Sequence, residues 1–225
     1  MFLFPTEQIR QILTLGLAQI DNYERELIPV RFCYPDYDCH YTSAIAHHVS
    51  SKLQKSPLEI AQTLQQSIFL NYQLNSQLRI AVTDQGMLNF TLTDSYIQAC
   101  LEQLADADLR LNYTPNFQNF PQFTYTQYAY ARCCSLLRLA STYPHIFAPI
   151  GSISLGLNLI AIAETLTNLS HPQAIKLSQQ LTSLFCEASD RSDLSKSLSI
   201  LSLQVTQKLL HTLASGYINL PEYLP

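Results

Sequence analysis

The sequence of 225 residues has few charged side chains: Asp, Glu, Lys and Arg make up 13% of it, whereas a soluble domain usually has about 25%. Few cations are therefore left to hold a phosphate backbone, and the net charge of -4 gives the whole chain no attraction for nucleic acid. The charge balance is -4 over residues 1–105 and zero over residues 106–225. Any contact with nucleic acid is thus expected in the second half.

Glycine is also scarce, with five isolated residues, which excludes a glycine-rich dinucleotide loop. Gly151 and Gly156 have the spacing of a phosphate-binding loop, but Leu157 and Asn158 follow where that loop needs Lys and Ser or Thr. Neither a Gly-x-Ser-x-Gly elbow nor a His-Glu-x-x-His zinc motif occurs in the sequence. The sequence therefore predicts no catalytic residues and no nucleotide or other cofactor.

Long apolar runs are missing as well, since none reaches the ~18 residues of a membrane span. The longest uncharged run, residues 140–163, is interrupted by polar residues, prolines and glycines. The six cysteines follow no regular spacing, and no signal peptide is recognisable at the start of the sequence. We expect a cytoplasmic protein with reduced thiols and no membrane role.

One group of residues has the side chains that zinc prefers, namely thiols and imidazoles. The group consists of Cys33, Cys39, His40, His47 and His48. Its spacing matches no familiar zinc motif, and it contains no Cys-x-x-Cys pair. We therefore predict no metal site and expect these histidines to be solvated or in the core.

The first half of the chain has the pattern of a small α+β domain, residues 1–105. Apolar spacing predicts helices over residues 5–25, 42–53, 56–69 and 94–105, with a strand near 30–34. Ser56 and Glu59 form a capping box around Pro57, which marks the start of the third helix. The β-rich runs 78–83 and 87–91 predict a hairpin in which Gly86 has positive φ.

The second half is predicted to be helical. Residues 112–122 are rich in Pro, Asn, Gln and Phe without a period, so 106–122 is interpreted as a linker. Helices are predicted over 127–140, 155–169, 173–187 and 193–215, the last between a Ser192 cap and Gly216. The chain is therefore expected to be mainly α, with a helical bundle over residues 123–225.

Three stretches resemble arginyl-tRNA synthetases, and they occur in that family's order. The first joins Cys39 to Ala46 with Lys55 to Ala61, and it resembles the family's additional N-terminal domain. The second, Gly86 to Leu92, is similar to the strand that closes that domain. The third, Tyr125 to Arg132 followed by Ser135 to Arg138, is similar to the helix that opens the DALR anticodon-binding domain.

The synthetase catalytic domain has no counterpart in this sequence. Only about 30 residues separate Leu92 from Tyr125, and both the His-x-Gly-His and the Lys-Met-Ser-Lys-Ser signatures are missing. The resemblance thus implies a non-catalytic, synthetase-like protein in which an N-terminal domain is fused to a DALR-type helical bundle.

The resemblance also implies a partner, tRNA or another structured RNA. Tyrosines would stack on bases, and cations would hold phosphates, with added contacts from the N-terminal domain. The candidate RNA-binding residues are Tyr125, Gln127, Tyr128, Tyr130, Arg132, Arg138, Lys208, Asn89 and Phe90. Tyr125, Tyr128 and Arg132 are spaced by three and four residues, so they share a helix face, where core packing is the other interpretation.

The alternative function is that of a protein-protein adaptor that kept the fold and lost RNA binding. The low charge and the many Tyr, Phe and Leu residues favour this hypothesis. RNA binding predicts that Arg132, Arg138 and Lys208 lie on one face with the tyrosines. The adaptor hypothesis predicts an exposed aromatic patch without a basic rim.

Overall fold

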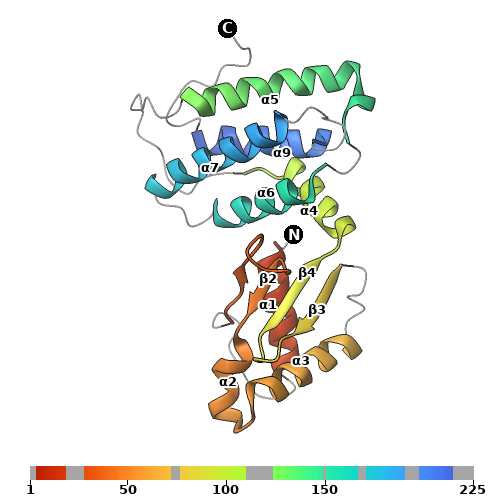
Figure 1. The fold of residues 1–225 in the computed structure, drawn as a ribbon, viewed down its shortest axis with the longest axis vertical. Coiled ribbons are helices and arrows are strands. Elements are labelled where there is room, and N and C mark those ends of the chain that lie inside the picture. Colours follow the sequence, from red (N-terminus) through yellow and green to blue (C-terminus); the bar gives the residue numbers. More distant parts are fainter. Residues whose placement is uncertain are drawn as a thin grey trace. The chain divides into compact units, whose positions relative to one another are not determined.

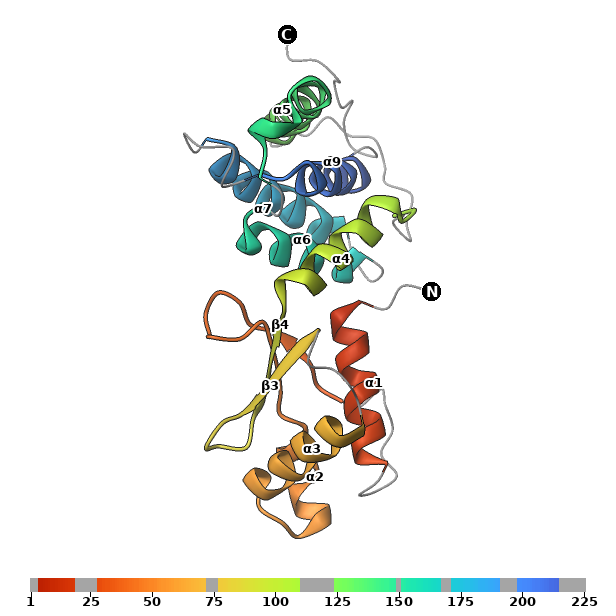
Figure 2. The ribbon, with the colours of Figure 1, turned by 90° about the vertical axis from the view of Figure 1, so that its right-hand side faces the viewer.

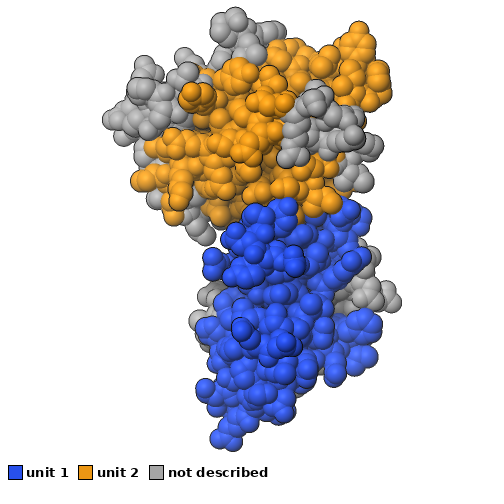
Figure 3. Space-filling view, viewed as in Figure 1, with its two compact units in different colours: residues 1–97 blue, residues 98–225 orange. Residues whose placement is uncertain are grey.

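The computed structural model describes residues 4–18, 28–71, 77–109, 124–148, 151–166, 171–190 and 198–214. The chain divides into two compact units, residues 1–97 and residues 98–225 (Figure 3). Eight α-helices and one four-stranded sheet lie within the described residues, which confirms a mainly helical protein with a small sheet. Most of the predicted linker, 106–122, lies outside the described residues, so its bounds remain a prediction.

The first unit contains an antiparallel sheet with strand order β1 (Arg31–Phe32), β2 (Tyr41–Ser43), β4 (Leu88–Leu92) and β3 (Leu78–Val82) (Figure 1). Side chains of a strand point alternately to its two faces. In β4, Leu88, Phe90 and Leu92 are buried, whereas Asn89 and Thr91 are only partly buried. One face of the sheet therefore belongs to the core.

Helices α1 (Pro5–Leu17), α2 (Ile45–Leu53) and α3 (Pro57–Asn71) complete this unit, and α1 and α3 lie on the same side of the sheet (Figure 2). The fully buried core combines apolar residues of these helices with the inner face of the sheet and with Ile28, which precedes β1. Its largest members are Tyr41, Phe90, Ile9, Leu13, Leu17, Ile28, Ile45, Ile60 and Leu64.

Two local sequence signals are confirmed. The Ser56 amide N–H donates to Glu59 Oε2 at 3.0 Å, and the Glu59 amide N–H donates to Ser56 Oγ at 3.2 Å, which is the predicted capping box. Gly86 lies in the β3–β4 turn with φ of 80°. There its backbone approaches the start of α3 so closely that a Cβ would lie 2.6 Å from the Pro57 carbonyl carbon.

In the first unit, the predicted helices over residues 42–53 and 5–25 depart most from the bounds in the structure. Helix α2 begins at Ile45 rather than at Thr42, because Tyr41–Ser43 pairs with β4 in the register Tyr41↔Phe90 and Ser43↔Leu88. Helix α1 ends at Leu17, and the next residue, Ala18, is in a turn. The rest of the predicted helix, up to residue 25, lies outside the described residues.

Helix α4 (Asp94–Asp106) contains the boundary between the two units, after Ile97. The second unit continues with α5 (Thr124–Thr142), the 3-10 turn η4 (Pro144–Ile146), α6 (Ile153–Thr165), α7 (His171–Ser189) and α9 (Ile200–Ala214) (Figure 1). The expected helical bundle is therefore present among the described residues.

Side-chain contacts give the relative directions of three helices in this bundle. Thr182 of α7 donates to Thr126 of α5, and Arg132 donates to Ser189, so α5 and α7 run in parallel. Gln207 of α9 donates to Cys134, and the ring of His211 lies 6.2 Å from that of Tyr130, so α9 is antiparallel to α5.

The last helix begins later than predicted. Leu198 and Ser199 are not helical, and α9 starts at Ile200. A reciprocal pair caps it: the Ser199 amide donates to Ser202 Oγ and the Ser202 amide donates to Ser199 Oγ, each at 3.0 Å. The predicted cap Ser192 and stop Gly216 lie outside the described residues. No described helix is both long and apolar enough to cross a membrane.

Candidate functional site

Helix α5 presents two tyrosines on its outer side. Tyr125 is 78% exposed and Tyr128 is 43% exposed. Large aromatic side chains are usually mostly buried, so the helix face that exposes these two is a candidate binding surface. We call Tyr125, Tyr128 and Arg132 the α5 stripe, because their spacing places all three on one face of the helix.

Arg132 joins this stripe to the end of α7. Its Nη1 donates to the Tyr128 hydroxyl at 3.3 Å, and its Nε donates to Ser189 Oγ at 3.1 Å. Its Nη2 donates to the Ser189 carbonyl at 3.1 Å and lies 3.2 Å from Asp190 Oδ1. The guanidinium therefore offsets the negative end of the α7 dipole as well as the Asp190 carboxylate.

The other candidate residues of this unit do not all join the stripe. Tyr130 is 8% exposed and lies beside His211, so it is mainly a core residue. Gln127 is half-buried. Arg138 is exposed and donates to Ser135 Oγ at 3.0 Å, while six residues along the helix place it about 120° around the axis from Arg132.

Lys208 of α9 has a different environment. Its ammonium donates to the carbonyls of Leu104 and Ala105 at the end of α4. A cation there satisfies backbone acceptors that lack helical partners and favours the helix dipole. The structure thus brings Tyr125, Tyr128 and Arg132 together, whereas Lys208 stabilises the end of α4. The prediction that Arg132, Arg138 and Lys208 share one face with the tyrosines is therefore wrong for these contacts.

In the first unit, the two candidates Asn89 and Phe90 lie on opposite faces of β4. Phe90 is completely buried, so its ring cannot contact RNA at the surface, and we remove it from the candidate residues. Asn89 is half-buried, and its Oδ1 accepts a hydrogen bond from Thr42 Oγ1 at 2.9 Å. Period-two alternation in β4 already implied that only one of these neighbours faces outward.

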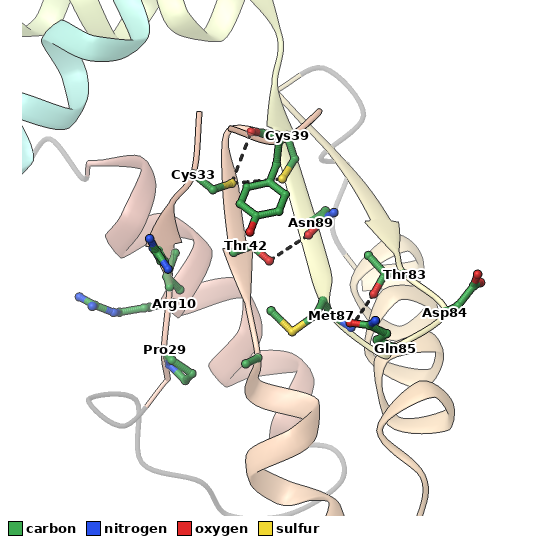
Figure 4. Close-up of a pocket in the computed structure, with 14 residues that line it drawn as sticks. Arg10, Pro29, Cys33, Cys39, Thr42, Thr83, Asp84, Gln85, Met87 and Asn89 are labelled. Carbon is green, nitrogen blue, oxygen red and sulfur yellow. Dashed lines mark hydrogen bonds between the residues drawn. The ribbon is translucent and has the colours of Figure 1, made fainter. Parts of the chain in front are cut away.

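Asn89 also lines a cavity of about 790 Å³ in the first unit (Figure 4). Two cysteines that were considered as zinc ligands, Cys33 and Cys39, lie in the same wall with their sulfurs 3.2 Å apart. Nδ1 of the adjacent His40 accepts the Leu92 amide N–H at 3.0 Å, and burial lowers the pKa of this imidazole. His40 therefore has a structural partner in the sheet.

Among the described residues, no cluster of three or more His, Cys, Asp or Glu side chains has a geometry suited to a metal ion. Sequence reasoning missed two features of these sites: the anchoring of Arg132 by Ser189 and Asp190, and the pairing of Cys33 with Cys39 in a cavity. The first joins residues 57 positions apart, for which no local pattern exists.

Comparison with known proteins adds no family assignment: no family model matches the sequence, and no curated protein matches it.

Proposed function

We propose that this chain is a non-catalytic, arginyl-tRNA synthetase-like protein that binds tRNA or another structured RNA through the α5 stripe. The observation that carries the proposal is the 78% exposure of Tyr125 on a helix whose sequence resembles the first helix of a DALR anticodon-binding domain. An exposed phenol ring next to a guanidinium on one helix face suits the unstacked bases of an RNA loop.

The two tyrosines and the arginine would have separate roles. Tyr125 and Tyr128 offer rings on which bases can stack, and such stacking contributes about 1–3 kcal/mol per base. Arg132 offers a guanidinium for a phosphate, a contact that depends on salt. Arg132 also stabilises the end of α7, so its replacement would disturb the fold, and Tyr125 is the cleaner residue to change.

The test is a fluorescence titration of the full chain with a structured tRNA transcript at low and at physiological salt. Tyr125→Ala should weaken binding by roughly 5- to 150-fold, which corresponds to the loss of about 1–3 kcal/mol of stacking. Tyr143→Ala is the matched control, since Tyr143 is 48% exposed and lies outside the stripe. Equal affinity of Tyr125→Ala and the wild type would refute the proposed contact.

One observation favours the alternative, a protein-protein adaptor. Arg132 is already paired with Asp190, and Lys208 is bound to the end of α4, so few cations surround the exposed tyrosines. An aromatic patch without a basic rim is typical of a protein interface. Absence of saturable RNA binding by the folded chain at low salt would select this alternative.

A further inference from the structure

Two buried thiols in the first unit are held side by side. Cys33 follows β1 and Cys39 precedes β2, and the Cys33 amide donates to the His40 carbonyl at 3.0 Å. The His40 amide in turn donates to the Phe90 carbonyl at 2.9 Å. These backbone bonds join both ends of the intervening turn to the sheet, so the 3.2 Å distance between the two sulfurs is set by the fold (Figure 4).

Both sulfurs are shielded from bulk water yet lie in the wall of a cavity. The exposed fractions of Cys33 and Cys39 are 5% and 4%. The cavity of about 790 Å³ falls within the range of roughly 300–1,000 Å³ that is usual for small-molecule sites. Arg10, Arg31 and Asp84 also line it, and Arg10 lies 3.6 Å from Glu7, so Arg31 supplies the attraction of this wall for a small anion.

We propose that Cys33 and Cys39 are a redox modification site, which forms a reversible disulfide when a small anionic disulfide such as glutathione disulfide enters this cavity. The reaction is a thiol-disulfide exchange. Two protein thiols lose two electrons and two protons, one protein S–S bond forms, and the S–S bond of the oxidant is reduced to two glutathione thiols.

The two cysteines have different parts in this exchange. Burial and the hydrogen bond to Cys39 raise the pKa of Cys33 to about 12, against the opposing effect of Arg31. The Cys33 thiol also donates to the Cys39 carbonyl at 3.4 Å, a bond that needs its proton. In the proposed exchange Cys39 attacks first, forming a mixed disulfide and releasing one glutathione, which takes up the Cys39 proton. Cys33 then attacks the Cys39 sulfur, the bond from that sulfur to glutathione breaks, and the second glutathione takes up the Cys33 proton as it leaves.

Other cysteines of the chain serve as internal controls. Cys133 and Cys134 are neighbours in sequence but have separate partners in the second unit: the Cys133 thiol donates to the Leu203 carbonyl, and Cys134 accepts from Gln207. Adjacent positions in one helix direct their side chains about 100° apart. We expect no disulfide between these two, despite their proximity in the chain.

The experiment uses the native full chain and glutathione disulfide, followed by denaturation, alkylation and tryptic digestion without reductant. Cys33 and Cys39 are the only cysteines of one tryptic peptide, residues 32–52. This peptide should lose both alkylation sites and become lighter by two hydrogens, and dithiothreitol should restore it. Cys33→Ser should stop at a glutathione adduct on Cys39, whereas Cys134→Ser should behave as the wild type.

A second measurement uses only the wild-type chain, so it does not require any substituted variant to fold. Phenylarsine oxide bridges two nearby thiols and releases one water, so it should bind the native wild type and protect both cysteines of peptide 32–52 from alkylation. The proposal is overturned if this peptide stays fully alkylated after treatment with glutathione disulfide, whether or not it binds phenylarsine oxide, or if the wild type stops at a glutathione adduct. Neither readout depends on RNA binding, because the α5 stripe lies in the other unit.

Discussion

Replacement of Gly86 by alanine should strongly destabilise the first unit. A Cβ at this position would lie 2.6 Å from the Pro57 carbonyl carbon and 2.8 Å from the Leu58 amide nitrogen, whereas non-bonded carbon atoms prefer about 3.5–4.0 Å. Both neighbours are backbone atoms at the start of α3, so no change of rotamer relieves the clash. The turn or the helix must shift.

The magnitude follows from three contributions. The positive φ costs a non-glycine residue about 1–2 kcal/mol, and overpacking costs about 1–3 kcal/mol. Alanine recovers roughly 0.4–1 kcal/mol by restricting the unfolded chain. Gly86→Ala should therefore lower the free energy of unfolding of this unit by about 1–5 kcal/mol, a large share of the 5–15 kcal/mol that is usual for a protein.

Urea unfolding of the full chain, followed by far-UV circular dichroism, measures this loss, and hydrogen exchange of peptides from β3 and β4 assigns the transition to the first unit. Gln85→Ala is the matched control, since the neighbouring Gln85 is exposed. Gly86→Asn separates the two causes, because asparagine tolerates positive φ but still carries a Cβ. A Gly86→Ala variant within 0.5 kcal/mol of wild type, the range of neutral surface changes, would refute the reasoning.

Two further predictions concern helix starts. Hydrogen bonds from Ser56 lower the pKa of Glu59 below its usual 4.5. The ionised carboxylate therefore stabilises the fold above that value, and this contribution is lost as the pH falls through the lowered pKa. In urea unfolding, the free energy of unfolding of Glu59→Gln should therefore decrease less than that of the wild type between neutral and acidic pH. Ser199→Ala removes the N-cap oxygen that accepts the Ser202 amide at the start of α9 and should cost about 1 kcal/mol, whereas the exposed control Gln204→Ala should remain within about 0.5 kcal/mol of wild type in the same assay.

Features that depend on a few consecutive residues were predictable from the sequence. The capping box joins Ser56 to Glu59, and the positive φ of Gly86 follows from a hairpin turn, so both are fixed by local chemistry. Strand β2 was not predicted, because Tyr41–Ser43 becomes a strand by pairing with Arg31–Phe32 on one side and with Leu88–Phe90 on the other. The second of these partners is more than 40 positions away in the sequence, so no local pattern around Tyr41 contains it.

The candidate site shows the same division. Helical spacing correctly placed Tyr125 and Tyr128 on one face of α5 and left open whether that face was buried. Burial depends on which helices pack around α5, which a single helix does not determine. Lys208 was expected to hold a phosphate, but its partners are α4 carbonyls more than 100 positions away, a contact that only the folded bundle creates.

The anchoring of Arg132 has a consequence for any anion that approaches α5. The guanidinium already has the Asp190 carboxylate and the Ser189 carbonyl as acceptors. A phosphate that binds Arg132 must therefore displace Asp190. Such an exchange leaves the number of ion pairs unchanged and adds little net electrostatic attraction. Arg132 would then make binding selective. Only a ligand whose bases also stack on the tyrosines would gain enough free energy of binding for its phosphate to replace Asp190.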